Sequence, residues 1–513
     1  MTLTRRKFTY MAAALAGSQA LRVPSFALGT TQSQPSDGRT ELTSLTIAAA
    51  AAKLRKRDVT SLELTEACLA RIATYNPKVD AFITVIAEQA RAQAKQMDAE
   101  LKMGKSRSPL HGIPIALKDN IDTAGVRTTG GSALYADRVP DTDAPVAAKL
   151  REAGAVLLGK LNMHEFALGA GETSYFGAAR NPWALDRNTG GSSSGSGAAL
   201  SADLCYGALG TDTGGSVRFP ATFCSVVGLK VTYGLVPIRG IMPLTLSLDS
   251  CGPMARTVED TAILLNYMTG YDNSDITSVR HESEDYVAAI KQPVSAFRVG
   301  MPYGCYDRLD PEVRANVMSA IDVIRKLVKE VKDVSLPSVG DAALIGPYAE
   351  TYAWHKETFD AQPGKYMLHT RRSIEANSKM DATTYIRAHW QLERLRRTVD
   401  ETFSTFDLVV LPTMNILPPK LQDMLDADAH PAPHDPQSYG NASLFNLYGT
   451  PAISIPCGFS SEGLPIGLCI SGPHFSEGRI LALAHAYESA TEWHQRRPPL
   501  HPDTPVPALV ESI

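Results

Sequence analysis

Apolar side chains recur every three to four residues in several stretches of this chain, with polar side chains between them. This period is typical of helices that pack one face on a core. Thr60 or Ser61 can cap one of these helices, because Glu63 stands in its first turn. The pattern predicts helices over residues 44–57, 61–75, 87–103 and 311–331, and a further helix after Gly197.

Short aliphatic runs without polar interruption separate these helical stretches. Runs of this length, rich in Val, Ile and Leu, are typical of buried strands. Because strands alternate with helices, we expect an α/β fold with a large mixed central sheet flanked by helices on both faces. The predicted strands cover residues 113–117, 155–159, 297–301, 408–411, 452–455 and 466–470.

The composition is that of an ordinary soluble globular enzyme. Of the 513 residues, 44% are hydrophobic and 20% are charged, and the formal net charge is -4. No basic stretch suggests nucleic-acid binding, and beyond the start of the chain no apolar run has the length of a transmembrane helix. We therefore expect a small-molecule substrate, no nucleic-acid partner and no stable membrane insertion, and we leave a homodimer open.

The N-terminus differs from the rest of the chain. Arg5 and Arg6 precede a modestly apolar stretch, and small residues stand at the third and last positions before a cut after Ala27. This pattern is typical of a twin-arginine export signal, although a basic N-terminus also arises by chance. It predicts a periplasmic or secreted protein. The predicted division is a signal peptide over residues 1–27, a polar linker over 28–40 and a single domain over 41–505.

Cysteine usage indicates neither a disulfide framework nor a metal centre. The cysteines are odd in number, scattered, and without a C-x-x-C pair. Zinc sites and disulfide-rich folds need closer, paired spacing, so we expect no metal and no cofactor. Four of the cysteines stand in apolar surroundings typical of buried packing residues. The seven are Cys68, Cys205, Cys224, Cys251, Cys305, Cys457 and Cys469.

Two serines on glycine-rich backbone and one upstream lysine are the candidate catalytic groups. Ser192 lies in the run over residues 190–197, Ser216 ends a Gly-Gly-Ser turn, and Lys118 follows the first predicted strand. A serine hydroxyl needs a base near neutral pH. A buried lysine can be that base, because burial disfavours the ammonium form. Strand ends are where active-site groups gather in α/β folds, and Ser192 can relay a proton between Lys118 and Ser216.

The backbone around Ser216 is a candidate oxyanion hole. Glycines let successive N–H groups point into one concavity, which can hold the oxyanion of a tetrahedral intermediate. Other interpretations of the Gly/Ser runs are a flexible linker and a phosphate-binding loop. Apolar flanks count against the first, and the lack of G-x-x-x-x-G-K-[ST] and G-x-G-x-x-G motifs counts against the second. We assign this oxyanion hole, a nest of backbone N–H groups, to Thr213, Gly214, Gly215 and Ser216.

These motifs resemble those of the amidase signature family of serine hydrolases. The likeness runs from about residue 42 to about residue 499 and is weakest between about 270 and 405. A signature of this length rarely arises by chance, and the resemblance implies the amidase signature fold. The matching segments are residues 112–120, 190–197, 207–220, 228–234, 247–249, 252–257, 449–452 and 463–468.

The resemblance also implies a role for each candidate residue. Ser216 matches the family's acyl-forming nucleophile, Ser192 the bridging serine after a typically cis peptide bond, and Lys118 the base. Arg218 and Asp212 match positions that brace the nucleophile loop, and a structural ion pair is the other interpretation. The implied reaction converts a carboxamide to a carboxylic acid and ammonia or an amine.

The segment over residues 162–177 resembles the A-type chain of glutamyl-tRNA amidotransferases, which makes ammonia from glutamine for a partner. His164 stands where aspartate is usual there, and we favour a structural histidine over a metal ligand. Phe219 and Cys469 stand where glutamine is common. With the predicted export signal, these departures favour a stand-alone exported amidase. The alternatives are a glutamine-dependent amidotransferase chain of the A type, an esterase or carbamate hydrolase, and a binding protein without catalysis.

We expect substrate choice in residues 300–430 and in loops over 120–140 and 162–176. Arg371 and Arg372 stand roughly where the A-type amidotransferase chain binds the glutamine carboxylate, although a solvated helix face also explains them. We predict a small or aryl carboxamide, or an N-substituted amide. Five aromatic side chains are candidates for an apolar pocket or for the core: Trp354, His355, Tyr366, Trp390 and Tyr439.

Overall fold

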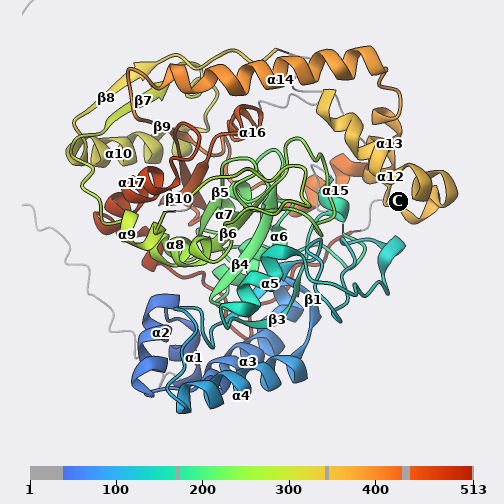
Figure 1. Cartoon of the computed structure of the whole chain (residues 1–513), viewed down its shortest axis with the longest axis vertical. Coiled ribbons are helices and arrows are strands. Elements are labelled where there is room, and N and C mark those ends of the chain that lie inside the picture. The colour runs from blue at the N-terminus through green and yellow to red at the C-terminus, as the bar shows by residue number, and fades with distance from the viewer. Residues whose placement is uncertain (1–37, 169–173, 283, 341–345, 430–439, 511–513) are drawn as a thin grey trace, which may run out of the picture. The chain divides into compact units, whose positions relative to one another are not determined.

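One mixed sheet of 11 strands runs through the computed structural model of the chain (Figure 1). The strands are β1 (Phe82–Val85), β2 (Pro114–Lys118), β3 (Val156–Leu161), β4 (Gly207–Asp212), β5 (Val227–Lys230), β6 (Ser250–Ala255), β7 (Arg298–Pro302), β8 (Glu330–Val334), β9 (Leu408–Pro412), β10 (Ala452–Phe459) and β11 (Pro465–Ser471). Across the sheet their order is β1-β3-β2-β4-β6-β5-β10-β11-β9-β7-β8. Pairs β2–β3, β2–β4, β7–β8 and β7–β9 are parallel, and the other neighbours are antiparallel. The predicted mixed sheet is thus confirmed.

The structure describes residues 38–168, 174–282, 284–340, 346–429 and 440–510. The predicted signal peptide over residues 1–27 and the first ten positions of the predicted linker, 28–37, lie outside the described residues. The remaining linker positions belong to the first helix. Residues Gly38–Ile513 form one compact unit. None of the helices in these described ranges is long and apolar enough to cross a membrane.

Helices connect most of the strands. Thr60 caps α3 (Ser61–Val79): its hydroxyl accepts the N–H of Glu63, and the Glu63 carboxylate in turn accepts the Thr60 N–H. The α-helices are α1 (Gly38–Thr43), α2 (Ile47–Lys56), α3 (Ser61–Val79), α4 (Ala87–Lys102), α5 (Pro145–Glu152), α6 (Ser194–Ser201), α7 (Arg218–Phe223), α8 (Val258–Asn266), α9 (Tyr286–Ala289), α10 (Pro311–Leu327), α12 (Ala349–Ala361), α13 (Leu368–Asn377), α14 (Ala382–Thr402), α15 (Leu421–Ala429), α16 (Ser443–Tyr448) and α17 (Glu477–Ser489).

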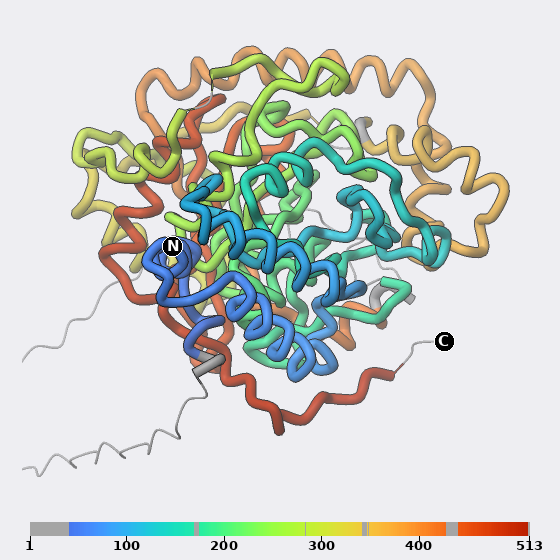
Figure 2. The backbone as a smooth tube through the Cα atoms, turned by 60° about the horizontal axis from the view of Figure 1, so that its bottom comes forward, coloured from blue at the N-terminus to red at the C-terminus, as the bar shows by residue number. Residues whose placement is uncertain are grey.

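Helices cover both faces of the sheet, as predicted. On β10, the hydroxyl of Ser454 bonds that of Thr222 in α7. The neighbouring Ile453 and Ile455 point to the opposite face, because side chains alternate along a strand, and there α10 and α17 pack against β10. Figures 1 and 2 show α14 along the edge of this unit farthest from the N-terminal helices α1 to α4.

Four predicted helix boundaries are off by three or four residues. The first of these helices begins at Ile47 and not at residue 44, and the second ends at Val79 and not at residue 75. The helix predicted over residues 311–331 ends at Leu327, and the next residues form β8 at the edge of the sheet. Three of the five residues of β8 are charged, a composition that an exposed edge strand tolerates. The helix expected after Gly197 begins earlier, at Ser194, so the glycine-rich run enters the helix.

Four further strands escaped prediction, namely β1, β4, β5 and β6. Glycines interrupt the aliphatic pattern in β4 and β6. A Cβ on Gly210 would lie 2.7 Å from the Ser193 hydroxyl, and one on Gly252 would collide with the Leu229 carbonyl. Close packing at these two positions therefore requires the residue type that weakens the strand signal.

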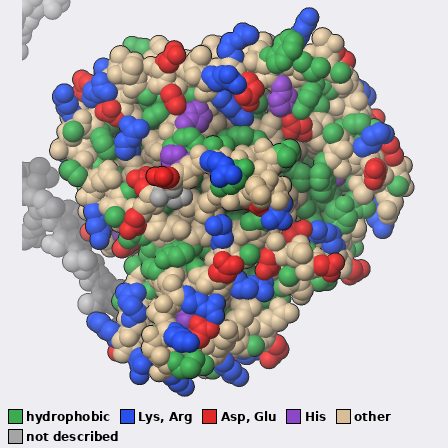
Figure 3. Space-filling view, in the orientation of Figure 1, with side chains coloured by type: hydrophobic (Ala, Val, Ile, Leu, Met, Phe, Trp, Pro, Cys, Tyr) green, Lys and Arg blue, Asp and Glu red, His purple; other side chains and the backbone are tan. Residues whose placement is uncertain are grey.

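Charged groups and cysteines are distributed as a globular unit requires. Figure 3 shows Lys and Arg side chains interspersed with Asp and Glu over the face in view. All seven cysteines are buried, and no disulfide joins them.

Candidate active site

The candidate base lies at the carboxyl ends of two neighbouring parallel strands, β2 and β4. Lys118 is the last residue of β2, and Thr211 stands near the end of β4. The fully buried Lys118 Nζ donates to the Thr211 hydroxyl at 2.7 Å and to the Ser192 hydroxyl at 2.8 Å. The predicted contact between Lys118 and Ser192 is therefore present.

The glycine-rich run that carries Ser192 is an ordered part of the core. The peptide bond between Gly191 and Ser192 is cis, as the resemblance implies. Ser192 is only 2% exposed, and the run continues directly into α6. These observations exclude the flexible-linker interpretation.

Ser216 lies in the turn between β4 and α7, beside this run. Its carbonyl accepts the N–H of Ser193 at 3.2 Å, which joins the two glycine-rich segments. Ser216 is partly exposed and borders the largest cavity near the site. The structure thus places Ser216 at a surface that substrate can reach, whereas Ser192 and Lys118 are buried.

The predicted oxyanion nest needs one correction. The N–H of Gly215 donates to the Asp212 carboxylate at 2.8 Å, so this amide is already committed. Gly215 serves the turn differently: its φ is +129°, and a Cβ there would lie 2.5 Å from the Phe219 ring. Gly214 and Ser216 line the cavity and remain candidate donors. Thr213 does not line it, and its hydroxyl, not its N–H, donates to Asp249.

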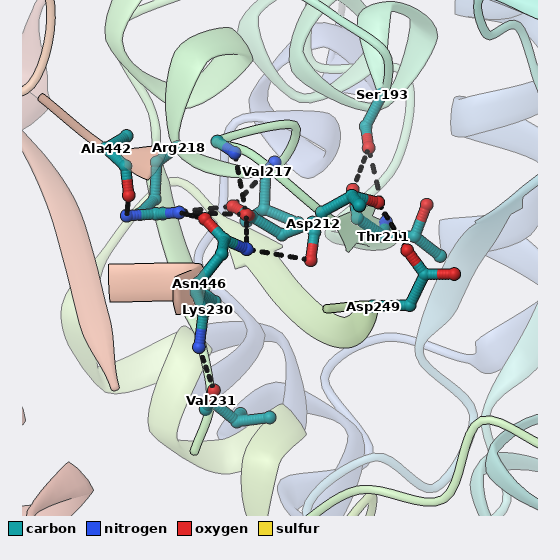
Figure 4. A network of polar contacts seen from close by, with 12 residues as sticks. Ser193, Thr211, Asp212, Val217, Arg218, Lys230, Val231, Asp249, Ala442 and Asn446 are labelled. Atoms are coloured by element: carbon teal, nitrogen blue, oxygen red, sulfur yellow. Dashed lines mark hydrogen bonds and ion pairs between the residues drawn. The ribbon is translucent and has the colours of Figure 1, made fainter. Parts of the chain in front are cut away.

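A buried ion pair holds the turn that carries Ser216 (Figure 4). Arg218 and Asp212 are both fully buried and meet at 2.8 Å. Asp212 also accepts the N–H groups of Gly215 and Val217 and the side-chain amide of Asn446. Burial alone would raise the pKa of Asp212, but Arg218, Asn446 and Lys230 together outweigh burial and hold this pKa well below its usual range. The pair is structural, and it also braces the nucleophile turn.

Burial tunes the candidate base. It lowers the pKa of Lys118 to about 7, against the opposing effect of the Asp249 and Asp212 carboxylates. A large fraction of Lys118 is therefore neutral near pH 7, as a general base must be. A second fully buried lysine was missed by sequence reasoning: burial also lowers the pKa of Lys230 to about 7.

The cavity beside Ser216 has a volume of about 300 Å³ and mainly apolar walls. No lysine or arginine lines it among the residues that the structure describes. Its polar groups are few, and glycine backbone forms part of its floor. The apolar lining consists of Ala167, Leu168, Phe219, Phe223, Leu244, Tyr348, Met414, Pro419 and Met424.

Most of the predicted pocket aromatics lie elsewhere. His355 and Tyr366 are buried around Phe166 in a cluster that adjoins the cavity wall, but neither lines the cavity. Trp354 and Trp390 are 40% and 66% exposed. Tyr439 lies outside the described residues. The cavity aromatics are instead Phe219, Phe223 and Tyr348, which no periodic pattern in the sequence marks as a set.

The predicted substrate segments contribute unequally. Residues 162–176 and 300–430 supply lining residues, whereas no described residue of 120–140 does. Arg371 and Arg372 lie on α13 and not in the lining. His164 borders the cavity and packs its imidazole against the Cα of Gly191. The described residues contain no group of three His, Cys, Asp or Glu side chains that could hold a metal ion.

This arrangement coincides with a known family. Residues 63–481 match the family model described as Amidase. The chain belongs to the amidase signature family. Its 11-stranded sheet is the amidase signature fold, with the glycine-rich run and the Ser216 turn on adjacent segments.

Relatives within the amidase signature family differ in activity. The A-type chain of the glutamyl-tRNA(Gln) amidotransferase of Desulfatibacillum aliphaticivorans is 41% identical over 489 residues, which is 89% of this chain and 99% of that one. The solved peptide amidase PAM, in complex with the competitive inhibitor chymostatin, has a TM-score of 0.78 and 30% identity over 89% of this chain and 99% of that one. A vestigial protein complex that reveals the origins of an s-triazine catabolic enzyme contains a chain with a TM-score of 0.80 and 27% identity, over 87% of this chain and 98% of that one.

Proposed function

We propose that this chain hydrolyses carboxamides through an acyl-enzyme on Ser216. The observation that carries the proposal is the 2.8 Å contact between Lys118 Nζ and Ser192 Oγ, beside the turn of Ser216. A neutral amine next to a hydroxyl is the combination that activates a serine without histidine or metal. Amide hydrolysis also agrees with the family to which the chain belongs.

The proposed proton path combines the contact between Lys118 and Ser192 with the nucleophile role that the family resemblance implies for Ser216. Neutral Lys118 takes the proton of Ser192 while Ser192 takes that of Ser216, and Ser216 Oγ bonds to the amide carbon. Amides of Gly214 and Ser216 stabilise the resulting oxyanion. The C–N bond then breaks as the proton on Lys118 returns through Ser192 to the leaving nitrogen. Water then gives a proton to the same relay and adds to the acyl carbon. The bond between this carbon and Ser216 Oγ breaks as the relay returns the proton to Ser216 Oγ, and the carboxylic acid leaves.

The cavity favours an uncharged acyl group. Its walls are mainly aliphatic and aromatic, and the described lining offers no lysine or arginine to pair with a carboxylate on the substrate. Burying an unpaired carboxylate in such walls is costly. We therefore propose a small aliphatic or aryl carboxamide, or an N-substituted amide, as the substrate. An ester or carbamate with the same acyl group fits the same chemistry.

A second candidate is ammonia release from glutamine for a partner chain. The relative with 41% identity over 99% of its length is the A-type chain of an amidotransferase, which favours this function. The free amino acid carries an α-carboxylate that the apolar walls disfavour. Phe219 occupies a lining position where those chains usually carry glutamine. A partner chain that completes the site would remove this objection.

The test is a panel of aliphatic, aryl and N-substituted amides together with glutamine, with release of ammonia or amine as the readout. Ser216→Ala should abolish release. Ser196→Ala is the matched control, because its hydroxyl in the same glycine-rich run donates to the Leu209 carbonyl and should leave turnover intact. Release from aryl or aliphatic amides supports the proposal. Release from glutamine alone, rising when the B- and C-type amidotransferase chains are added, supports the second candidate and contradicts the first.

We propose further that the chain is exported by the twin-arginine route. The support is the paired Arg5 and Arg6 ahead of the apolar stretch. Cell fractionation of the full chain beside an Arg5→Lys, Arg6→Lys double variant tests this proposal. Export of the first and retention of the second are expected, and equal distribution of both would contradict it.

A further inference from the structure

The carboxylate of Asp249 joins two parts of the site that are distant in sequence. Asp249 immediately precedes β6 and is only 7% exposed. One of its oxygens accepts the N–H groups of Leu244 and Thr245, at 2.9 Å and 3.2 Å. The other accepts the hydroxyl of Thr213 at 2.5 Å (Figure 4).

Two hydrogen-bond partners of Asp249 belong to parts of the active site. Thr213 opens the turn that carries Ser216, and Leu244 is part of the wall of the substrate cavity. The same carboxylate therefore fixes the nucleophile turn and the substrate wall relative to each other. Loss of this tie would shift both surfaces that position a substrate carbonyl.

Asp249 lines a small internal space that Thr211 also borders. This cavity of about 10 Å³ lies between Asp249, Thr211, Thr213 and Ser250 on its polar side, and Leu244 is among its apolar walls. The Thr211 hydroxyl accepts the hydrogen bond of Lys118. Thr211 therefore connects the amine of Lys118 to the space that the carboxylate lines.

Three neighbouring acidic groups affect the pKa of Lys118, and Asp249 has the largest effect. The described acidic groups that act on Lys118 are Asp249, Asp212 and the Cys251 thiol. Asp212 is neutralised by its ion pair with Arg218, and burial raises the pKa of the Cys251 thiol to about 12.

Glu350 is the charged group that faces Asp249 from the neighbouring α12. Its carboxylate accepts from Tyr385, bonds the His389 imidazole, and accepts the Ser247 N–H. Burial and the Glu350 carboxylate both raise the pKa of Asp249. Of the acidic groups that act on Lys118, Asp249 has the largest effect.

We propose that Asp249 is a positioning residue of the amide-hydrolysing site: it ties the Ser216 turn to the substrate wall and sets the charge state of Lys118. This inference rests on the proposed function. Burial raises the pKa of Asp249 to about 7, and its carboxylate raises the pKa of Lys118 against the effect of burial. The two groups therefore titrate as a coupled pair near neutral pH.

The sign of the expected pH effect follows. A nearby anion favours the ammonium form of Lys118. In Asp249→Asn the anion is gone, so neutral Lys118 should persist to lower pH. The acidic limb of kcat/KM should move down by about 1 pH unit, while kcat/KM at its maximum falls about 10- to 100-fold as the tie loosens.

The control is Asp260→Asn in α8. Asp260 is another fully buried aspartate that accepts two backbone N–H groups, those of Ile47 and Ala48, and burial raises its pKa to about 6. Its replacement should lower the melting temperature without moving the acidic limb. Thr213→Val, which removes only the hydroxyl tie, should lower the maximum.

The rate at which a serine-directed phosphonate labels Ser216, measured against pH, is the primary readout. It needs no known substrate, and circular dichroism establishes that each variant is folded. A downward shift of the limb in Asp249→Asn and not in Asp260→Asn is the expected result. An unmoved limb in folded Asp249→Asn, or an equal shift in Asp260→Asn, overturns the inference. Failure of the wild-type protein to be labelled at any pH would instead contradict the proposed function.

Discussion

Lys118 and Lys230 are both fully buried, and burial lowers the pKa of each to about 7. Their hydrogen-bond partners differ. Lys118 donates to the hydroxyls of Ser192 and Thr211, whereas Lys230 donates to two main-chain carbonyls, one of which Figure 4 shows. A hydroxyl can give up a proton, and a carbonyl cannot.

The comparison teaches that burial alone does not make a base. Both lysines have a neutral form near pH 7, but of the two only Lys118 contacts hydroxyl groups, from which it can take a proton. Lys230 bonds the carbonyls of Val231 and Thr450. Val231 directly follows β5, and Thr450 lies just before β10, the strand that pairs with β5. We infer that Lys230 stabilises the fold and that Lys118 takes part in the chemistry.

The largest expected effect separates these two lysines. Lys118→Ala should lower kcat roughly 10³- to 10⁴-fold, because loss of one relay member disables the whole relay. Lys230→Met should keep kcat within about tenfold and lower the melting temperature, since each of two buried carbonyls loses its donor at about 1–3 kcal/mol. Steady-state kinetics and thermal unfolding of both variants test this. Equal inactivity of the two folded variants would break the comparison.

A smaller effect concerns the ion pair behind Ser216. Arg218→Met leaves the buried Asp212 charge uncompensated and should cost about 3–5 kcal/mol of unfolding free energy. The control is Arg298→Met, whose partner Asp407 is a partly exposed carboxylate and whose loss should cost about 0–1 kcal/mol. Urea unfolding measures both. Similar losses in the two variants would show that burial of the Arg218 pair has no special weight.

The smallest effect sharpens the substrate assignment. Phe219→Ala widens the apolar wall next to Gly215, so KM for aryl amides should rise about tenfold while kcat changes less. Trp390→Ala, which truncates a side chain 66% exposed on α14, should leave both constants unchanged within about twofold. Michaelis–Menten kinetics on an anilide series measures both. An unchanged KM in Phe219→Ala would place the acyl group elsewhere.

Residue motifs predicted the chemical groups of the site because the motifs are local. The Gly-Gly-Ser turn, the strand that ends at Lys118 and the glycine-rich run around Ser192 each lie within a short segment. The structure brings Lys118 and Ser192 into contact as predicted. The hydrophobic pattern predicted the mixed sheet but only six of its 11 strands, and the family resemblance named the fold.

Features that depend on distant contacts could not be predicted. The commitment of the Gly215 amide to Asp212 and the placing of Tyr348 and Phe223 in the cavity arise from how separate segments meet. The tie from Asp249 to Thr213 also spans 36 positions. The spacing of residues in the sequence does not indicate which distant segments are in contact. Edge strand β8 escaped because its polar residues follow a helix pattern without a break.

The central claim is that Ser216 becomes acylated. The most direct measurement is peptide mapping by mass spectrometry after rapid quenching with an aryl ester whose acyl group suits the apolar cavity. The account predicts the acyl mass on the peptide that contains Ser216, absent in Ser216→Ala and much slower to form in Lys118→Ala. An acyl group on another residue, or turnover that persists in Ser216→Ala, would contradict it.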